Sequence, residues 1–165
     1  MIRVEKKLWK ALWCYGESIL ITTAILVVGY TLQLLYGCID YHLFSWPVNG
    51  WFGLFVVFFS IIFGAIYKRS RFTLWFSGSN FSICLMGGIL LLTLLMGLIP
   101  QITDLDSIPD NWISGCGLNR ITSSWPFALL YITLLMSLGV LVVRFMIPFK
   151  LSKISFCLNH FGLWL

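Results

Sequence analysis

Long apolar stretches alternate with short polar or charged segments along this chain. Four of the stretches have the roughly 20 residues that a helix needs to cross the hydrocarbon core of a bilayer. They cover residues 18–36, 48–67, 81–99 and 125–147. Ser124 and Pro126 are typical of the first turn of a helix, so they mark the start of the fourth stretch. The pattern predicts an all-α, polytopic transmembrane helical bundle with four complete spans.

A fifth apolar stretch covers residues 154–165. As a helix it would rise only about 18 Å, against a hydrocarbon core of about 30 Å. Because a helix that ended there would leave carbonyl groups unpaired in lipid, we expect a fifth span that is truncated in this sequence. A re-entrant or interfacial segment is the alternative. We therefore interpret residues 1–165 as a single membrane region.

The composition agrees with this interpretation, since 59% of the residues are hydrophobic, 17% aromatic and only 10% charged. Soluble domains carry about a quarter charged residues, and disordered chains are poor in aromatic residues. Both classes are excluded, and the lipid bilayer is the expected surrounding. The net charge of +5 accompanies no interleaved basic and aromatic patch, so a nucleic acid is not an expected partner.

Basic residues are concentrated in alternate connecting segments. Most of them precede the first span, follow the second or follow the fourth: Arg3, Lys6, Lys7, Lys10, Lys68, Arg69, Arg71, Lys150 and Lys153. The third loop instead carries Arg120 against Asp104, Asp106 and Asp110. By the positive-inside rule, the N-terminus is cytoplasmic and the protein crosses the membrane several times. Tryptophans are expected at both interfaces: Trp9, Trp13 and Trp75 at the inner one, and Trp46, Trp51, Trp112 and Trp125 at the outer one.

Small residues inside the spans predict close contacts between helices. They include Ser60 with Gly64, the Gly87–Gly88 pair with Gly97, and Gly29 with the polar side chain of Gln33 nearby. Arg144 lies near the end of the fourth span, where its long side chain can reach the interface. The phenylalanines of the second span favour a lipid-facing surface, with a ligand groove as the alternative: Phe52, Phe55, Phe58, Phe59 and Phe63.

Catalytic motifs are missing from the sequence, which has no Gly-rich phosphate loop, no nucleophile elbow and no Cys-x-x-Cys pair. An enzymatic role for this chain alone is therefore not predicted. Cys38 and Cys116 both fall in outer loops, where a disulfide between them is one hypothesis and two unrelated thiols the other.

His160 is the most conspicuous candidate for chemistry. It lies seven residues after Lys153 within the fifth apolar stretch, hence about 10 Å along a helix from that charge. An ionisable group at such depth indicates a functional site, and a neutral imidazole is a good iron ligand. An interhelical hydrogen bond, shared with Asn159, is the alternative.

Four short segments resemble one membrane-protein family. They are Trp46–Asn49, Met96–Gln101, Thr122–Phe127 and Asn159–Trp164. In this order they are similar to the N-terminal membrane region of ResB-like (CcsB-type) cytochrome c biogenesis proteins, above all the fused ResB–CcsA form of Bacteroidetes-type bacteria. The resemblance extends over essentially the whole chain.

The resemblance implies a role in System II cytochrome c biogenesis in the bacterial inner membrane. There haem b is handled for export and attached to apocytochrome c, and His160 is the position that matches the family's axial haem ligand. A CcsA-type membrane protein or domain and apocytochrome c are the implied partners of a haem lyase complex. The family's periplasmic domain, tryptophan-rich motif and second transmembrane histidine have no counterpart here. A non-catalytic membrane scaffold that stabilises a partner is the alternative function.

Overall fold

The computed structural model of the chain describes residues 14–40, 42, 45–67, 69–102, 111–147, 154–155, 158–159 and 162. The four predicted spans are all helical in it. They are α1 (Tyr15–Tyr36), α2 (Val48–Ile61) with the π-helical turn η2 (Ile62–Ile66), α4 (Ser79–Leu98) and α6 (Trp125–Met146). Each is long and apolar enough to cross a membrane. The prediction of an all-α helical bundle with four spans is confirmed.

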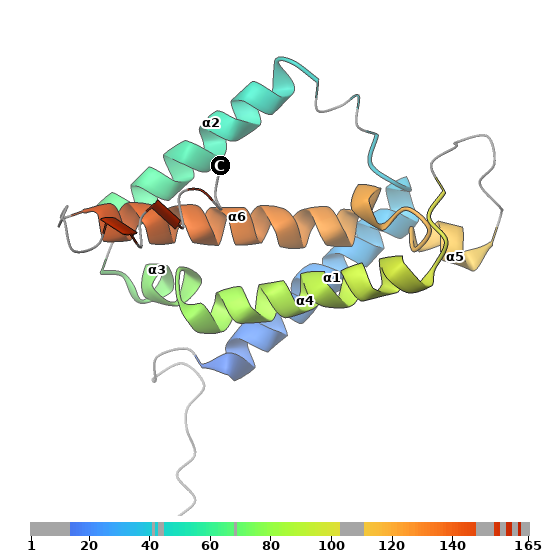
Figure 1. Ribbon diagram of the computed structural model, residues 1–165, viewed down its shortest axis with the longest axis horizontal. Helices are drawn as coiled ribbons and strands as arrows, with labels where there is room; N and C mark the ends of the chain where they lie inside the picture. The colour runs from blue at the N-terminus through green and yellow to red at the C-terminus, as the bar shows by residue number, and fades with distance from the viewer. Residues whose placement is uncertain are drawn as a thin grey trace, which may run out of the picture.

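Helix α6 is the centre of the bundle, because α1, α2 and α4 all pack against it. Helices α1 and α4 also contact each other. Helix α2 meets α6 from another side, and α2 comes close to α6 only toward the C-terminal end of α2 (Figure 1). Consecutive spans run in opposite directions. We call the end of the bundle that holds Tyr15, Arg69, α3 (Arg71–Phe76) and Met146 the basic end. The other end, with Tyr36, Leu98 and Trp125, is the loop end.

The short helix α3 follows Arg69 and differs from the simple loop expected there. Ser70 caps it by accepting a hydrogen bond from the Thr73 N–H, and Thr73, Trp75 and Phe76 are buried. Trp75 is only 7% exposed, and its indole N–H donates to the Ser18 hydroxyl of α1 at 3.0 Å. Trp75 therefore differs in its burial from the interfacial tryptophan that was expected. The ring lies near the basic end but belongs to the core.

The other described tryptophans fit the expectation better. Trp46, Trp51 and Trp112 are 80%, 71% and 73% exposed, as residues of an interface belt are. Trp125 is partly buried at the start of α6. Trp9 and Trp13 lie outside the described residues.

Close helix contacts form where three of the small residues lie. A Cβ on Gly29 would meet the Pro126 Cα at 2.6 Å, and one on Gly64 would meet the Val143 Cβ at 2.7 Å. A Cβ on Gly88 would lie 3.1 Å from the Leu130 Cδ1. These three predictions are confirmed, and all three contacts are with α6. Gly87 and Gly97 instead face open space.

The phenylalanines of α2 and η2 divide between two environments. Phe55 and Phe58 are exposed, as expected for side chains that face lipid. Phe59 and Phe63 pack on the core, where the Phe59 ring lies 6.0 Å from the Phe76 ring and the Phe63 ring 5.8 Å from the Phe72 ring. These ring contacts attach α2 and η2 to α3 at the basic end.

Helix α6 begins with Ser124 as N-cap, as predicted, but the Ser124 hydroxyl does not cap the helix. It donates instead to the Ile121 carbonyl at 2.7 Å. The N–H of Trp125, the first helical residue, donates to Oε1 of Gln33 in α1 at 3.2 Å. The N-terminus of α6 is thus capped by a side chain of α1.

A candidate binding groove at the basic end

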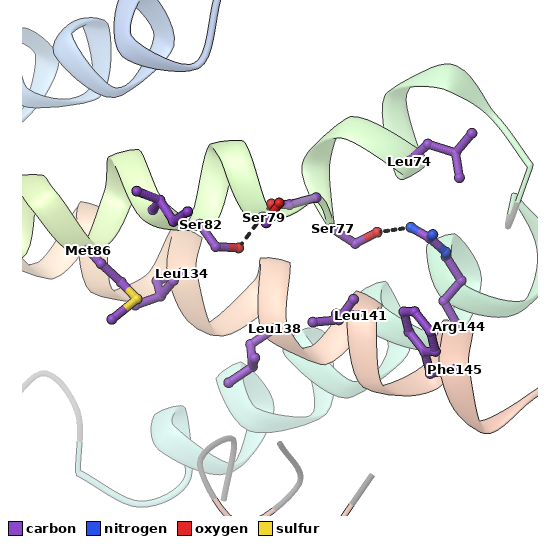
Figure 2. A pocket seen from close by; sticks show the side chains of 12 residues that line it. Leu74, Ser77, Ser79, Ser82, Met86, Leu134, Leu138, Leu141, Arg144 and Phe145 are labelled. Atoms are coloured by element: carbon purple, nitrogen blue, oxygen red, sulfur yellow. Dashed lines mark hydrogen bonds between the residues drawn. The ribbon is translucent and has the colours of Figure 1, made fainter. Parts of the chain in front are cut away.

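A groove of about 660 Å³ lies between α4 and α6 at the basic end (Figure 2). Residues from α3, α4, α6 and the turn between α3 and α4 surround it: Leu74, Ser77, Gly78, Ser79, Ser82, Ile83, Met86, Leu134, Leu138, Leu141, Arg144 and Phe145. Most of this lining is apolar, and the polar groups gather at the end near Arg144.

The apolar wall follows from helical spacing. Leu134, Leu138 and Leu141 recur at intervals of four and three residues, so they share one face of α6. On α4, Ile83 and Met86 stand three residues apart and are 53% and 59% exposed. Because both walls carry exposed apolar side chains, the groove opens toward the surroundings of the bundle rather than into its core.

Arg144 lies at the mouth of the groove. Its Nη1 donates a hydrogen bond to the Ser77 hydroxyl, and its guanidinium lies 5.6 Å from the centre of the Phe145 ring. No carboxylate pairs with Arg144 among the residues that the structure describes. A guanidinium offers several N–H donors in a planar fork, so the bond to Ser77 leaves donors that can bind an anion.

Hydroxyl groups fix the positions of the two helices beside Arg144. Ser137 of α6 donates to the Phe76 carbonyl at 2.6 Å, and its Oγ lies 3.3 Å from the Ser82 Oγ of α4. Ser77 donates to the Thr73 carbonyl at 2.7 Å while it accepts from Arg144. The groove mouth is therefore held by hydrogen bonds that join α3, α4 and α6.

The N-terminus of α4 also lies at this mouth. Gly78 is its N-cap residue and has no side chain that could accept a hydrogen bond from the first turn. The first N–H groups of a helix lack partners within the helix, and the helix dipole makes this end partly positive. Together with Arg144, the start of α4 gives the mouth a positive electrostatic character.

A second hollow, of about 690 Å³, lies at the loop end and is more polar. Its lining includes Cys38, Asp40, His42, Gln101 and Arg120. The backbone N–H of His42 donates to the Asp40 carboxylate at 2.9 Å, and Gln101 Oε1 accepts from the backbone N–H of Ile121 at 3.2 Å. The described residues include no group of three His, Cys, Asp or Glu side chains placed to hold a metal ion.

The principal residue predicted from the sequence, His160, lies outside the described residues, as do Asp104, Asp106 and Asp110. Of the fifth apolar stretch, residues 154–155, 158–159 and 162 are described, and they are helical. Cys38 and Cys116 are free thiols in this structure. Cys38 Sγ accepts a hydrogen bond from Gln33 Nε2 at 3.3 Å.

The groove itself was not anticipated from the sequence, although Arg144 was. One signal was present, because Arg144 is the only basic residue within the four helices that can span a membrane. From the sequence, its long side chain was expected to reach the interface. The structure adds that the guanidinium turns toward Ser77 across the groove mouth (Figure 2).

Comparison of the chain with protein-family models, with curated proteins and with solved structures finds no match.

Proposed function

We propose that this protein is a membrane component of System II cytochrome c biogenesis, in which it handles haem b for attachment to apocytochrome c. The observation that carries the proposal is His160, a histidine inside an apolar stretch that follows four membrane spans. Its neighbours in sequence, Asn159 and Gly162, belong to a segment that resembles the ResB-like family. A buried imidazole would serve as one axial ligand of the haem iron.

The direction of the chain supports a haem site nearer the cytoplasmic side. Helix α6 ends at Met146 at the basic end, so the stretch that carries His160 follows from that end. By the positive-inside rule the basic end faces the cytoplasm. As a continuous helix, this stretch would carry His160 about 10 Å into the membrane from Lys153. Haem held there would come from the cytoplasmic side and be passed outward.

The donor set of this chain fits half of a bis-histidine site. The sequence holds two histidines, and His42 lines the hollow at the loop end, opposite the end from which the His160 stretch follows. We therefore assign the second axial ligand to a partner, a CcsA-type membrane protein or domain. Haem supplies the iron and the vinyl groups of the attachment reaction. This chain would bind and orient it.

Two of the segments that carry the family resemblance, Met96–Gln101 and Thr122–Phe127, lie at the loop end of the fold. Gln101 ties the end of α4 to the loop before α6 through its bonds to the Leu118 carbonyl and the Ile121 N–H. Trp125 begins α6, where Gln33 caps its N–H. Both residues therefore take part in contacts that organise the loop end.

A scaffold that stabilises a partner membrane protein is the second candidate, and α2 favours it. None of the residues 48–55 is buried, and Trp51 and Phe55 are largely exposed. This half of α2 stands away from α6, with an apolar surface that helices of a partner would cover (Figure 1). Under this function, the stability of the partner protein, and not the binding of haem, would depend on this chain.

Haem occupancy separates the two functions. The protein would be purified with its partner, and the Soret absorbance of the native complex compared with that of His160→Ala. We expect His160→Ala to lose most of the haem while the partner still co-purifies, and the matched control His42→Ala to keep it. Unchanged haem and spectrum in His160→Ala would contradict the haem function. Loss of the partner alone would support the scaffold.

A further inference from the structure

We propose that the groove between α4 and α6 is a binding site for an anionic phospholipid of the membrane leaflet at the basic end. One acyl chain would lie along the apolar wall of the groove, and the phosphate would bind Arg144 at its mouth. The proposal rests on the groove geometry and does not depend on the haem function.

The length of the groove matches one leaflet. Leu134 and Arg144 both line it and are ten residues apart on α6, which corresponds to about 15 Å along the helix. This is half of the roughly 30 Å hydrocarbon core. An acyl chain with its head group at Arg144 would therefore end near Leu134, at the midplane of the bilayer.

The charge of the groove mouth selects an anion. Arg144 has no acidic partner among the described residues, so the Ser77 hydroxyl and the Phe145 ring stabilise its positive charge without neutralising it. An unpaired cation at the edge of the hydrocarbon core is costly unless it binds an anion or water. Phosphate oxygens can accept two parallel hydrogen bonds from the planar guanidinium of an arginine.

The start of α4 adds further donors to the same place. Ser79 lines the groove and is the first residue of α4, and its neighbour Gly78 leaves the first turn without a side-chain cap. N–H groups at a helix N-terminus bind phosphate oxygens. Arg144 from α6 and the first turn of α4 would then contact one head group from two sides.

The exposed walls favour a lipid over a small free anion. Ile83 and Met86 are more than half exposed, and in a membrane they face acyl chains. A free phosphate would occupy only the mouth and leave the apolar wall uncovered. A phospholipid covers both parts. Because basic residues of the cytoplasmic side attract anionic lipids, the leaflet at the basic end would supply such a ligand.

Lipid binding is tested by native mass spectrometry of the purified protein, titrated with phosphatidylglycerol, phosphatidylcholine, glycerol 1-phosphate or oleate. We expect one saturable phosphatidylglycerol for each chain, weaker binding of phosphatidylcholine and no binding of glycerol 1-phosphate. Arg144→Gln should weaken phosphatidylglycerol binding roughly tenfold, the scale of one charged hydrogen bond. Arg71→Gln, which removes the same charge outside the groove, should not.

A second variant keeps the test independent of the stability of Arg144→Gln. Leu138→Trp retains the charge but fills the apolar wall, so it should reduce binding of phosphatidylglycerol and phosphatidylcholine together. The proposal would be overturned if Leu138→Trp bound both lipids as the native protein does. It would equally be overturned if Arg71→Gln and Arg144→Gln lost the same affinity, or if glycerol 1-phosphate bound as well as the lipid. None of these outcomes bears on haem at His160.

Discussion

Gln33 in α1 caps helix α6 by accepting a hydrogen bond from the backbone N–H of Trp125 at 3.2 Å, although the two residues are 92 positions apart. The same side chain donates through Nε2 to the Cys38 Sγ at 3.3 Å. Gly117, with φ of +69°, brings the loop before α6 so close that a Cβ there would lie 2.8 Å from Gln33 Nε2. One amide therefore joins two helices and a loop.

Replacing Gln33 should weaken this junction. Gln33→Met keeps the length of the side chain but removes both bonds, which leaves the Trp125 N–H without its acceptor. An unmade hydrogen bond of a buried group costs about 1–3 kcal/mol. We expect a lower free energy of unfolding, measured by denaturant titration in detergent micelles with helical circular dichroism as the signal.

Thr31→Val provides the matched control for this variant. Thr31 lies on the same helix, is exposed, and donates only to the Val27 carbonyl of its own helix at 2.8 Å. Its loss should leave the unfolding midpoint nearly unchanged. If Gln33→Met unfolds at the same midpoint as Thr31→Val, the cap contributes nothing to stability.

The contact between Gly29 and Pro126 predicts a steric effect. Gly29→Ala would place a methyl group 2.6 Å from the Pro126 Cα, which is backbone and cannot turn away. The methyl group should push α1 away from α6 and lower the free energy of unfolding by about 1–3 kcal/mol. Gly87→Ala is the control, because Gly87 has open space around it and alanine favours a helix by about 0.5–1 kcal/mol. Opposite shifts in thermal stability are expected, and equal shifts would disprove the close contact.

The contact of the π-helical turn with α6 predicts a similar pair. Gly64→Ala would meet both Val143 Cβ at 2.7 Å and the Val140 carbonyl at 3.0 Å, so the π-helical turn should be pushed away from α6. Gly53→Ala, on the same span but in open space, should leave the bundle intact. Limited proteolysis between α2 and α3 measures the difference. Equal cleavage rates in the two variants would argue against tight packing at Gly64.

The positive-inside rule, which predicts a cytoplasmic basic end, also predicts which thiols a reagent reaches. In a background with all native cysteines replaced by serine, a cysteine at Arg69 should react with an impermeant maleimide only after the cells are opened. A cysteine at Thr122, an exposed residue of the loop end, should react from outside. The reverse labelling pattern would show that the topology is opposite to the predicted one, since the two residues lie at opposite ends of the bundle.

The apolar pattern alone determined the four spans, because a bilayer requires long apolar helices whatever their neighbours are. Gly29, Gln33 and Gly64 were also recognisable in advance as contact positions, since small and polar residues in a span need a reason to be there. The helical state of α3 and the burial of Trp75 were not. The basic residues before them are typical of an ordinary loop. The contacts of Trp75 with Ser18 and Phe81 help to draw the segment into the core, and they depend on the tertiary structure.

The partners of each contact position were decided only by the tertiary structure. A sequence shows that Gln33 is polar, but only the crossing of α1 and α6 brings it to the Trp125 N–H. The sequence likewise shows that Arg144 is charged and near a helix end. Its role at a groove mouth depends on α3 and α4, which supply Ser77 and the second wall. The hydropathy of each residue depends only on its own side chain and the solvent around it. A groove, in contrast, exists only between helices that are already packed.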